Sequence, residues 1–151
     1  MIILSIDIGG TEGTGIVVYD TEVKKVMFSE TFNTRDKADG VMDFFYQVYS
    51  YGHRYSPDIM LVPIPTAHFS TTKRHHQKIG TLMVMADDLE IKMVQVVDSN
   101  CKKIVFGDGA VDKDFIAEAF IKQKKLKTEH ERDAYLFIKA FESGQLKLQD
   151  N

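Results

Sequence analysis

The stretch SIDIGGTEGTG, residues 5–15, stands where the first apolar run of the chain ends. It places one carboxylate, Asp7, at the end of a predicted strand and follows it with four glycines within seven positions. Two chemistries use such an arrangement. One is a glycine-rich loop that cradles phosphates, and the other is a metal site whose first carboxylate lies at a strand end.

The hydrophobic pattern around this stretch predicts an α/β domain with a mixed sheet. The expected strands cover residues 2–8, 15–19, 24–32, 59–62 and 93–97, and the first three form an antiparallel meander. Helical spacing of apolar residues predicts helices around 41–49, 79–89 and 115–120, and a last helix from Thr128. Thr128 and Glu131 form a Thr-x-x-Glu capping box at its start.

The resulting order, β-β-β-α-β-α-β-α-α, is that of the RNase H-like fold. This fold is a three-layer domain in which helices flank a five-stranded mixed sheet. We expect one such domain over residues 1–143 and a polar C-terminal tail over 144–151.

Two classes of protein with these chemistries can be compared with the chain. Sugar and acetate kinases of the actin-like fold bind ATP with an Asp-x-Gly-Gly-Thr loop, which residues 7–11 resemble. Those kinases place ATP between two domains, whereas 151 residues supply one domain and no second phosphate loop. Nucleases of the RNase H-like fold put their first metal-binding aspartate at the end of the first strand. The nuclease interpretation is therefore favoured, and a small phosphotransferase remains a third alternative.

Composition and charge limit the kinds of binding partner that the sequence supports. The net charge of −3 argues weakly against nucleic acid, but basic residues gather at 73–78, 102–103 and 122–127. Each of these clusters is also what a solvated protein face looks like. The single cysteine, Cys101, fits a reducing compartment and a packing role. No apolar run reaches the ~18–20 residues of a membrane span, so no membrane partner is expected.

The string CKKIVFGDGAVDKDFI, residues 101–116, carries the most specific motif. Lys102, Gly107, Gly109 and Lys113, with an apolar residue three positions further on, resemble the signature before the fourth helix of the RuvC family of Holliday-junction resolvases. The glycines would let the backbone approach a phosphate, and the amides that open the next helix would face an anion. The two lysines would add positive charge at the same place.

The resemblance runs from residue 1 to about 143. It implies that Asp7 binds Mg²⁺, since its counterpart in the family does so. HERDA, residues 130–134, matches the closing acidic motif of the family, in which the last aspartate, here Asp133, is a metal ligand. The position three residues earlier is aspartate or histidine in the family and is His130 here. SPDIMLV, residues 56–62, and KIGTL, residues 78–82, match a strand and a helix of the family.

The spacing of His130 and Asp133 supports the last match. The two residues are three positions apart, so they share a helix face with the apolar stripe that includes Ala134 and Phe137. Ionisable side chains at the head of a core-facing stripe are unexpected unless they form a site. The alternative is a local pair of polar residues at a helix start.

One position departs from the family pattern. The strand after the first helix ends in a glutamate in the family, where it is a second metal ligand, and this chain has Pro63 there. Glu12, Asp58 and His68 are the nearby substitutes, although Asp58 stands at the wrong end of its strand. The site would then hold one weakly bound Mg²⁺ or Mn²⁺ through Asp7, Asp133 and His130, or be inactive.

The loop after Pro63 offers contacts to DNA. Phe69 is placed to stack on a base, and Lys73 and Arg74 to bind phosphates. Phe69 packing on the edge of the sheet is an equal alternative.

The resemblance implies a metal-dependent endonuclease that cuts branched DNA such as a four-way junction, working as a homodimer. Asp7, His130, Asp133 and Lys113 are the candidate catalytic residues. A branched-DNA-binding relative that has lost cleavage with the glutamate is the alternative. The expected location is the cytoplasm, in a bacterium or a phage-infected host cell.

Overall fold

The computed structural model describes residues 1–9, 13–33, 38–64 and 73–146. Its strands are β1 (Ile2–Ile8), β2 (Thr14–Asp20), β3 (Lys25–Phe32), β4 (Ile59–Pro63) and β5 (Lys92–Val96). Its helices are α1 (Ala38–Tyr55), α2 (Lys73–Asp88), α3 (Asp98–Phe106), α4 (Lys113–Ala119) and α5 (Glu129–Glu142). The predicted tail from residue 144 remains a prediction, because residues 147–151 lie outside the described residues.

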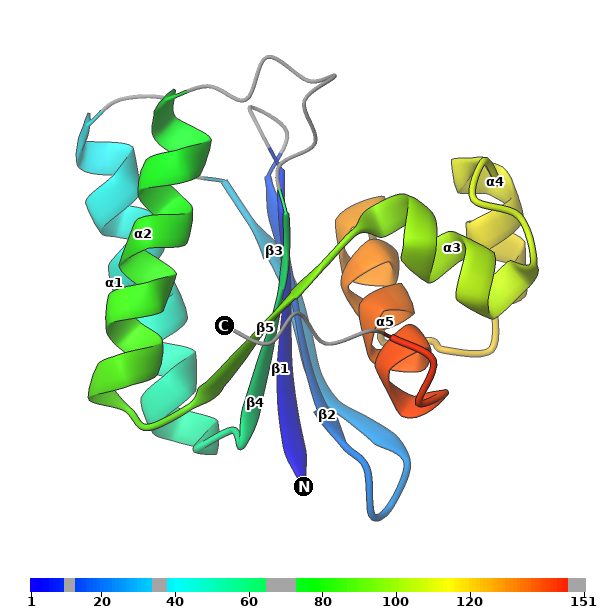
Figure 1. Cartoon of the computed structure of the whole chain (residues 1–151), viewed down its shortest axis with the longest axis horizontal. Helices are drawn as coiled ribbons and strands as arrows, with labels where there is room; N and C mark the ends of the chain where they lie inside the picture. The colour runs from blue at the N-terminus through cyan, green and yellow to red at the C-terminus, as the bar shows by residue number, and fades with distance from the viewer. Residues whose placement is uncertain (10–12, 34–37, 65–72, 147–151) are drawn as a thin grey trace.

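The sheet has the order β3-β2-β1-β4-β5. β1 and β2 are antiparallel, as are β2 and β3, whereas β4 runs parallel to both β1 and β5. Helices α1 and α2 cover one face and α3, α4 and α5 the other (Figure 1). The predicted three-layer domain with a five-stranded mixed sheet is therefore confirmed.

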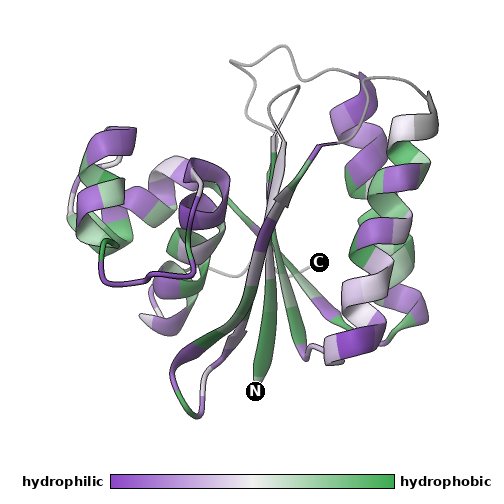
Figure 2. Ribbon diagram, turned by 180° about the vertical axis from the view of Figure 1, so that it is seen from behind, coloured by the Kyte–Doolittle hydropathy of each residue, from purple (hydrophilic) through white to green (hydrophobic). Residues whose placement is uncertain are grey.

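Alternation along the strands divides the core into two clusters. Ile3, Leu61 and Val96 belong to the cluster packed under α5, whereas Leu4 and Val62 belong to the cluster under α1 and α2. Figure 2 shows a largely hydrophobic central sheet between helices that mix hydrophobic and hydrophilic residues. Because side chains alternate, every second residue of β1, β4 and β5 points toward α5.

Helix α3 corrects the predicted order of elements. The sequence pattern predicted that the chain runs from the fifth strand through the glycine string into one helix, but α3 intervenes and ends at Gly107. The apolar residues of 101–106 follow a helical period: Cys101 is buried, and Ile104 and Val105 pack against the cluster under α5. No element was predicted from the sequence over this short apolar run, because such a run does not distinguish a strand from a helix by pattern alone.

Burial of Cys101 agrees with the predicted packing role. The thiol is fully buried, and this burial raises its pKa to about 12, so it stays protonated and unreactive at neutral pH. Among the described residues, no helix has the length and apolar character needed to cross a bilayer.

Candidate active site

Asp7 and His130 meet at the end of β1. Asp7 is the last of the β1 side chains that point toward α5, after Ile3 and Ser5, and His130 lies in the first turn of α5. His130 Nδ1 is 2.8 Å from Asp7 Oδ2, and the side chains are only 14% and 18% exposed. Two of the predicted site residues, 123 positions apart in the chain, are thus in direct contact.

The glycines after Asp7 explain how this contact is possible. A Cβ built on Gly15 would lie 2.3 Å from the carbonyl oxygen of His130, and one on Gly9 would lie 1.8 Å from the carbonyl oxygen of Gly13. Neither distance is physically allowed. Gly15 therefore lets β2 approach the start of α5, and Gly9 lets the end of β1 lie against the backbone of Gly13, an arrangement in which His130 reaches Asp7. This role needs no bound phosphate.

The start of α5 is held firmly on the sheet. Thr128 Oγ1 accepts a hydrogen bond from the Glu131 amide at 3.2 Å, which is the predicted cap. Glu131 does not bond back to Thr128, as a capping box would require. Its carboxylate is buried and accepts from the Lys127 amide at 2.7 Å and from the Thr31 hydroxyl at 3.1 Å. The first turn of α5 is thereby tied to β3.

Asp133 belongs to the same electrostatic centre. Burial, followed by the negative charges of Asp7 and Asp98, raises its pKa to about 7, while Lys102 and His130 oppose the rise. Burial also raises the pKa of Asp7, although its hydrogen bond with His130 acts in the other direction. That same hydrogen bond raises the pKa of His130. The three residues predicted as metal ligands therefore influence one another's protonation.

Asp98 was not predicted from the sequence. It opens α3 directly after β5, and its Oδ2 lies 2.7 Å from Nζ of Lys102, one turn further along the helix. Its charge raises the pKa of both Asp7 and Asp133. A signal was present in the sequence, because an acidic residue directly follows the apolar run 93–97.

Lys113 approaches the site from α4. Its Nζ is 2.8 Å from Glu129 Oε2, and the hydrogen bond from Lys113 lowers the pKa of Glu129. Glu129 Oε1 is in turn 3.8 Å from His130 Nε2. The lysine side chain is 69% exposed, so its ammonium group faces solvent beside the predicted catalytic histidine.

The glycine string has a different structural role from the predicted one. Gly107 ends α3 in the left-handed conformation, with φ of 81°, and a Cβ on Gly109 would lie 3.0 Å from the Ser99 carbonyl oxygen. The string therefore joins two helices. Asp112 caps α4 by accepting from the Phe115 amide at 2.8 Å. Its negative charge stands where the predicted anion would bind.

Pro63 ends β4 on the face toward α5, because Leu61 packs there and Pro63 is the next residue of that series. Its side chain offers no oxygen to the edge where Asp7 lies. Among the proposed substitutes, Asp58 accepts from the Ile2 amide at 2.7 Å at the opposite end of the strand. Glu12 and His68 lie outside the described residues.

The predicted DNA contacts are only partly described. Lys73 is exposed and Arg74 half-buried at the start of α2, and Arg74 Nη1 donates to Gln77 Oε1 at 2.9 Å. Phe69 falls outside the described residues. Lys78, a member of the same basic cluster, is buried, and its ammonium group lies 5.4 Å from the centre of the Phe44 ring. The basic surface at this helix start is therefore smaller than the sequence indicated.

The side chains of Asp7, Asp133 and His130 are of the chemical types that bind divalent cations. Two carboxylates and an imidazole are ligands that Mn²⁺ accepts, and the carboxylates alone suit Mg²⁺. A bound cation would also relieve the repulsion that raises the pKa of Asp133. In the part of the chain that the structure describes, however, no three acidic, histidine or cysteine side chains are gathered tightly enough to form a ready-made metal site.

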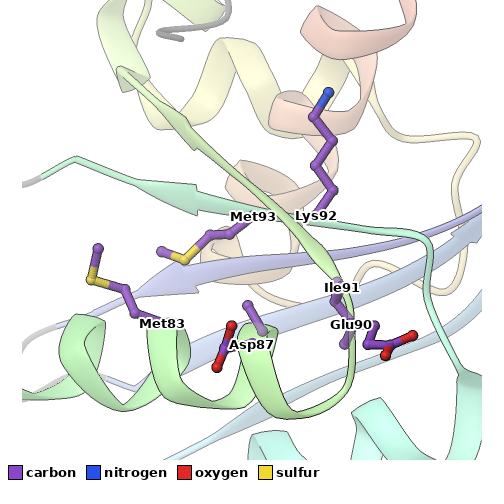
Figure 3. A pocket seen from close by; sticks show the side chains of 7 residues that line it. Met83, Asp87, Glu90, Ile91, Lys92 and Met93 are labelled. Atoms are coloured by element: carbon purple, nitrogen blue, oxygen red, sulfur yellow. The ribbon is translucent and has the colours of Figure 1, made fainter. Parts of the chain in front are cut away.

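A separate hollow lies between α2 and β5, away from these residues (Figure 3). Met83, Asp87, Glu90, Lys92 and Met93 are among the residues that line it. It mixes apolar and oppositely charged side chains and contains none of the predicted site residues. The candidate site therefore lies at the end of β1 where Asp7 stands, and not in this hollow.

Comparison with known proteins agrees with the fold. No protein-family model matches the sequence, and no curated protein matches it either. The structure of Thermus thermophilus RuvC is 18% identical, with a TM-score of 0.79 over 99% of this chain and 100% of that chain. T. thermophilus RuvC in complex with a Holliday junction substrate is 15% identical, with a TM-score of 0.73 over 96% of each chain.

The Fowlpox virus resolvase, solved with its substrate Holliday junction DNA, is 14% identical, with a TM-score of 0.65 over 93% of this chain and 99% of that chain. At these identities the likeness establishes the architecture, and it does so over nearly the whole length of each protein. From the order of its strands to the position of its last helix, the chain therefore has the RuvC-like form of the RNase H-like fold.

Proposed function

We propose that the chain is a structure-selective DNA endonuclease of the Holliday-junction-resolvase type, which hydrolyses phosphodiester bonds at branched DNA. The observation that carries the proposal is the contact between Asp7 and His130, with Asp133 one helical turn away and electrostatically coupled to both. Two structures of similar fold contain Holliday junction DNA, which supports a four-way junction as substrate.

Each residue has a role that its surroundings support. Asp7 and Asp133 would hold a divalent cation, Mg²⁺ or Mn²⁺, and such an ion supplies an activated water and charge neutralisation at the phosphate. Asp7 engages Nδ1 of His130, so Nε2 is the nitrogen that can bind the ion or carry a proton. Lys113, held at Glu129, would place a positive charge beside the substrate backbone.

DNA binding would use the basic residues at the same edge of the sheet. Lys73 and Arg74 stand at the start of α2, on the same end of the molecule as the last residues of β1 and β4 (Figure 1). Lys102 lies in α3, and the turn with Gly107 and Gly109 follows it. Phe69 remains a predicted stacking contact.

A second function is favoured by Pro63. Two-metal hydrolysis needs enough oxygen ligands to hold two cations about 4 Å apart, and this strand end supplies none. The second candidate is therefore a branched-DNA-binding protein that cuts slowly or not at all. The predicted homodimer and cytoplasmic location accompany either function as proposals. A homodimer would present two sites to the two strands of a junction.

The deciding experiment uses a labelled four-way junction. Cleavage is measured with Mg²⁺ and with Mn²⁺, and binding is measured by gel shift in EDTA, with linear duplex of the same sequence as control. Cutting of the junction alone supports the endonuclease. A shift without cutting supports the binding protein. Failure to bind or cut the junction rejects both, and ATP binding in its place would support the phosphotransferase. Light scattering on the same samples tests the homodimer.

A further inference from the structure

We propose that the turn over residues 122–127, which joins α4 to α5 and is called the lysine turn below, binds the phosphate backbone of a duplex arm of the branched DNA. The inference rests on the proposed function, because it names a further contact with the same substrate. It adds a surface to the contacts proposed above, which lie on α2, α3, α4 and the segment after Pro63.

The lysine turn concentrates positive charge in a chain whose net charge is −3. Residues 119–128 contain four lysines and no acidic residue, and the acids that flank this segment are Glu118 and Glu129. Lys122, Lys124 and Lys127 are exposed, and within the described part of the chain none of them forms an ion pair with a carboxylate. Positive surface charge that no acid neutralises attracts a polyanion.

The other two basic clusters keep less of their charge at the surface. In the cluster at 73–78, Lys78 is buried, and in the cluster at 102–103, Nζ of Lys102 lies 2.7 Å from Asp98 Oδ2. Among the described residues of these three clusters, the lysine turn therefore offers the most unpaired positive charge to a partner.

The lysine turn has a fixed shape. Ser29 Oγ donates to the Lys125 carbonyl oxygen at 2.5 Å, and Lys125 Nζ donates to the Met27 carbonyl oxygen at 2.9 Å. Leu126, in the same turn, is only 8% exposed and belongs to the cluster packed under α5. The turn is thereby tied to β3. Its exposed lysines are already placed before DNA arrives, and this lowers the cost of ordering them on binding.

The lysine turn also lies close to the candidate active site. Asp7 pairs with Gly15, and Gly15 pairs with Thr31, so these residues form one row across the sheet. Thr31 Oγ1 is 2.5 Å from Oγ1 of Thr128, the residue that follows the turn. With strands about 4.8 Å apart and a rise of about 3.3 Å per residue, Ser29 lies about 12 Å from Asp7. One turn of B-DNA is about 34 Å long, so a single duplex arm can contact both places.

The test replaces three lysines together, as Lys122→Gln, Lys124→Gln and Lys127→Gln, and measures affinity for a linear duplex and for a four-way junction in EDTA. Three phosphate contacts would contribute a log–log salt slope of about −2.7. We therefore expect the parent to lose about 40-fold more affinity than the triple variant between about 50 and 200 mM salt. If the turn is only a solvated face, the parent and the triple variant will have the same slope, and the proposal is wrong.

The matched control makes an equal change of charge elsewhere, as Lys24→Gln, Lys25→Gln and Lys92→Gln. All three lysines are exposed. Lys25 pairs with Asp20 at the end of the β2–β3 hairpin, and Lys92 begins β5 at the other edge of the sheet. This variant should keep the salt slope of the parent, because the charge that it removes is not at the proposed surface.

A photo-crosslinker locates the contact directly. Cys101, the one cysteine of the chain, is fully buried, so a thiol-reactive crosslinker on Lys124→Cys will attach to the new side chain. It should crosslink to a duplex arm of bound DNA, whereas the same reagent on Lys25→Cys should not. No crosslink from position 124, a parent that binds no duplex, or an effect of the triple variant confined to duplex RNA of the same sequence would each overturn the proposal. Circular dichroism melting confirms that each variant is folded.

Junction cleavage is measured on the same proteins, so the two proposals can fail separately. If the triple variant loses salt slope while the parent cuts no junction, the lysine turn is a DNA-binding surface and the endonuclease is rejected. If the parent cuts a junction and the triple variant binds and cuts as the parent does, the endonuclease stands and the role of the lysine turn is rejected.

Discussion

The two faces of the sheet are built from the same alternating strands but end differently at the edge where Asp7 lies. Toward α1 and α2, β1 ends in buried Ile8 and β4 in buried Val62. Toward α5, β1 ends in Asp7, and the chain after β5 continues into Asp98. Both faces supply hydrophobic stabilisation. Among the described residues, the α5 face brings Asp7 and His130 into contact where a strand ends and a helix starts, whereas the other face has the basic residues Lys73 and Arg74 at the start of α2. Substitutions of the site residues on the α5 face should therefore change activity while the core on the other face still stabilises the fold.

The largest expected effect is a loss of junction cleavage on substitution of Asp7. Its neighbour Ile8, on the opposite face of β1, serves as the control. Asp7→Asn should lower junction cleavage about 10³-fold, or about 4 kcal/mol of transition-state stabilisation, because it removes an ionised ligand for the cation. Junction binding in EDTA should be retained. Ile8→Val, on the other face, should leave cleavage unchanged and cost about 1 kcal/mol of stability. An Asp7→Asn protein that cuts as fast as the parent would place the site elsewhere.

Two glycines sharpen the comparison of the faces. Gly15→Ala should destabilise the protein by about 1–3 kcal/mol, because the new methyl group would collide with the backbone of His130. It should also weaken cleavage by displacing α5. Gly80→Ala, in α2, meets no atom within 4 Å and should stabilise the protein by about 0.5–1 kcal/mol. Urea denaturation of both variants checks the two signs, and equal effects would remove the structural reason for glycine at position 15.

Titration of Asp133 gives a smaller effect with a definite sign. Its pKa is raised from 3.8 to about 7, so its contribution to stability is complete below pH about 4 and is lost as the pH rises through about 7. Asp133→Asn should therefore raise the melting temperature relative to the parent at pH 8, by about 2–4 °C for about 1 kcal/mol after allowance for solvent screening. At pH 5 the difference should shrink or reverse.

Mg²⁺ provides the control for that titration. Because the ion binds the ionised carboxylate, it should stabilise the parent at pH 8 more than at pH 5 and leave Asp133→Asn nearly unaffected. A parent whose melting temperature responds to Mg²⁺ equally at both pH values would contradict the raised pKa of Asp133.

The smallest effect concerns salt. Affinity for a junction should fall with salt concentration on a log–log plot, and Lys73→Ala should reduce the slope by about 0.9 if that lysine binds one phosphate. Lys25→Ala changes another exposed lysine, at the start of β3, and should leave the slope unchanged. Identical slopes for the parent and Lys73→Ala would exclude Lys73 from the interface.

The sequence predicted the elements whose pattern is local and missed what depends on packing. The five strands followed from short apolar runs bounded by turn residues or proline, and the cap at Thr128 followed from a four-residue motif. Helix α3 was missed because its apolar residues form a short run that fits a strand as well as a helix. Lys78 was grouped with surface charges because its burial over Phe44 leaves no trace in a list of basic residues.

The candidate site shows the same division. Asp7, His130 and Asp133 were predicted from a strand end, from a shared helix face and from the resemblance. The structure brings Asp7 and His130 into contact, and the charge of Asp7 raises the pKa of Asp133. The need for glycine at position 15 was not predictable, because its close approach to the His130 backbone joins segments far apart in the chain. Asp98 went unnoticed for the same reason: its effect on the pKa of Asp7 and Asp133 joins segments far apart in the chain.

The hydrogen bonds that join the first strand to the last helix have a consequence for synthesis. Ser5 Oγ donates to the Ala134 carbonyl at 2.7 Å, and Asp7 contacts His130, so each bond closes a loop of more than 120 residues. A ribosome releases residue 5 long before residue 134, and such long-range contacts form slowly. A partly synthesised chain can therefore pair β1 with β2 but cannot assemble the charged edge. The proposed nuclease activity would be withheld from nucleic acid near the ribosome until α5 has emerged and docked.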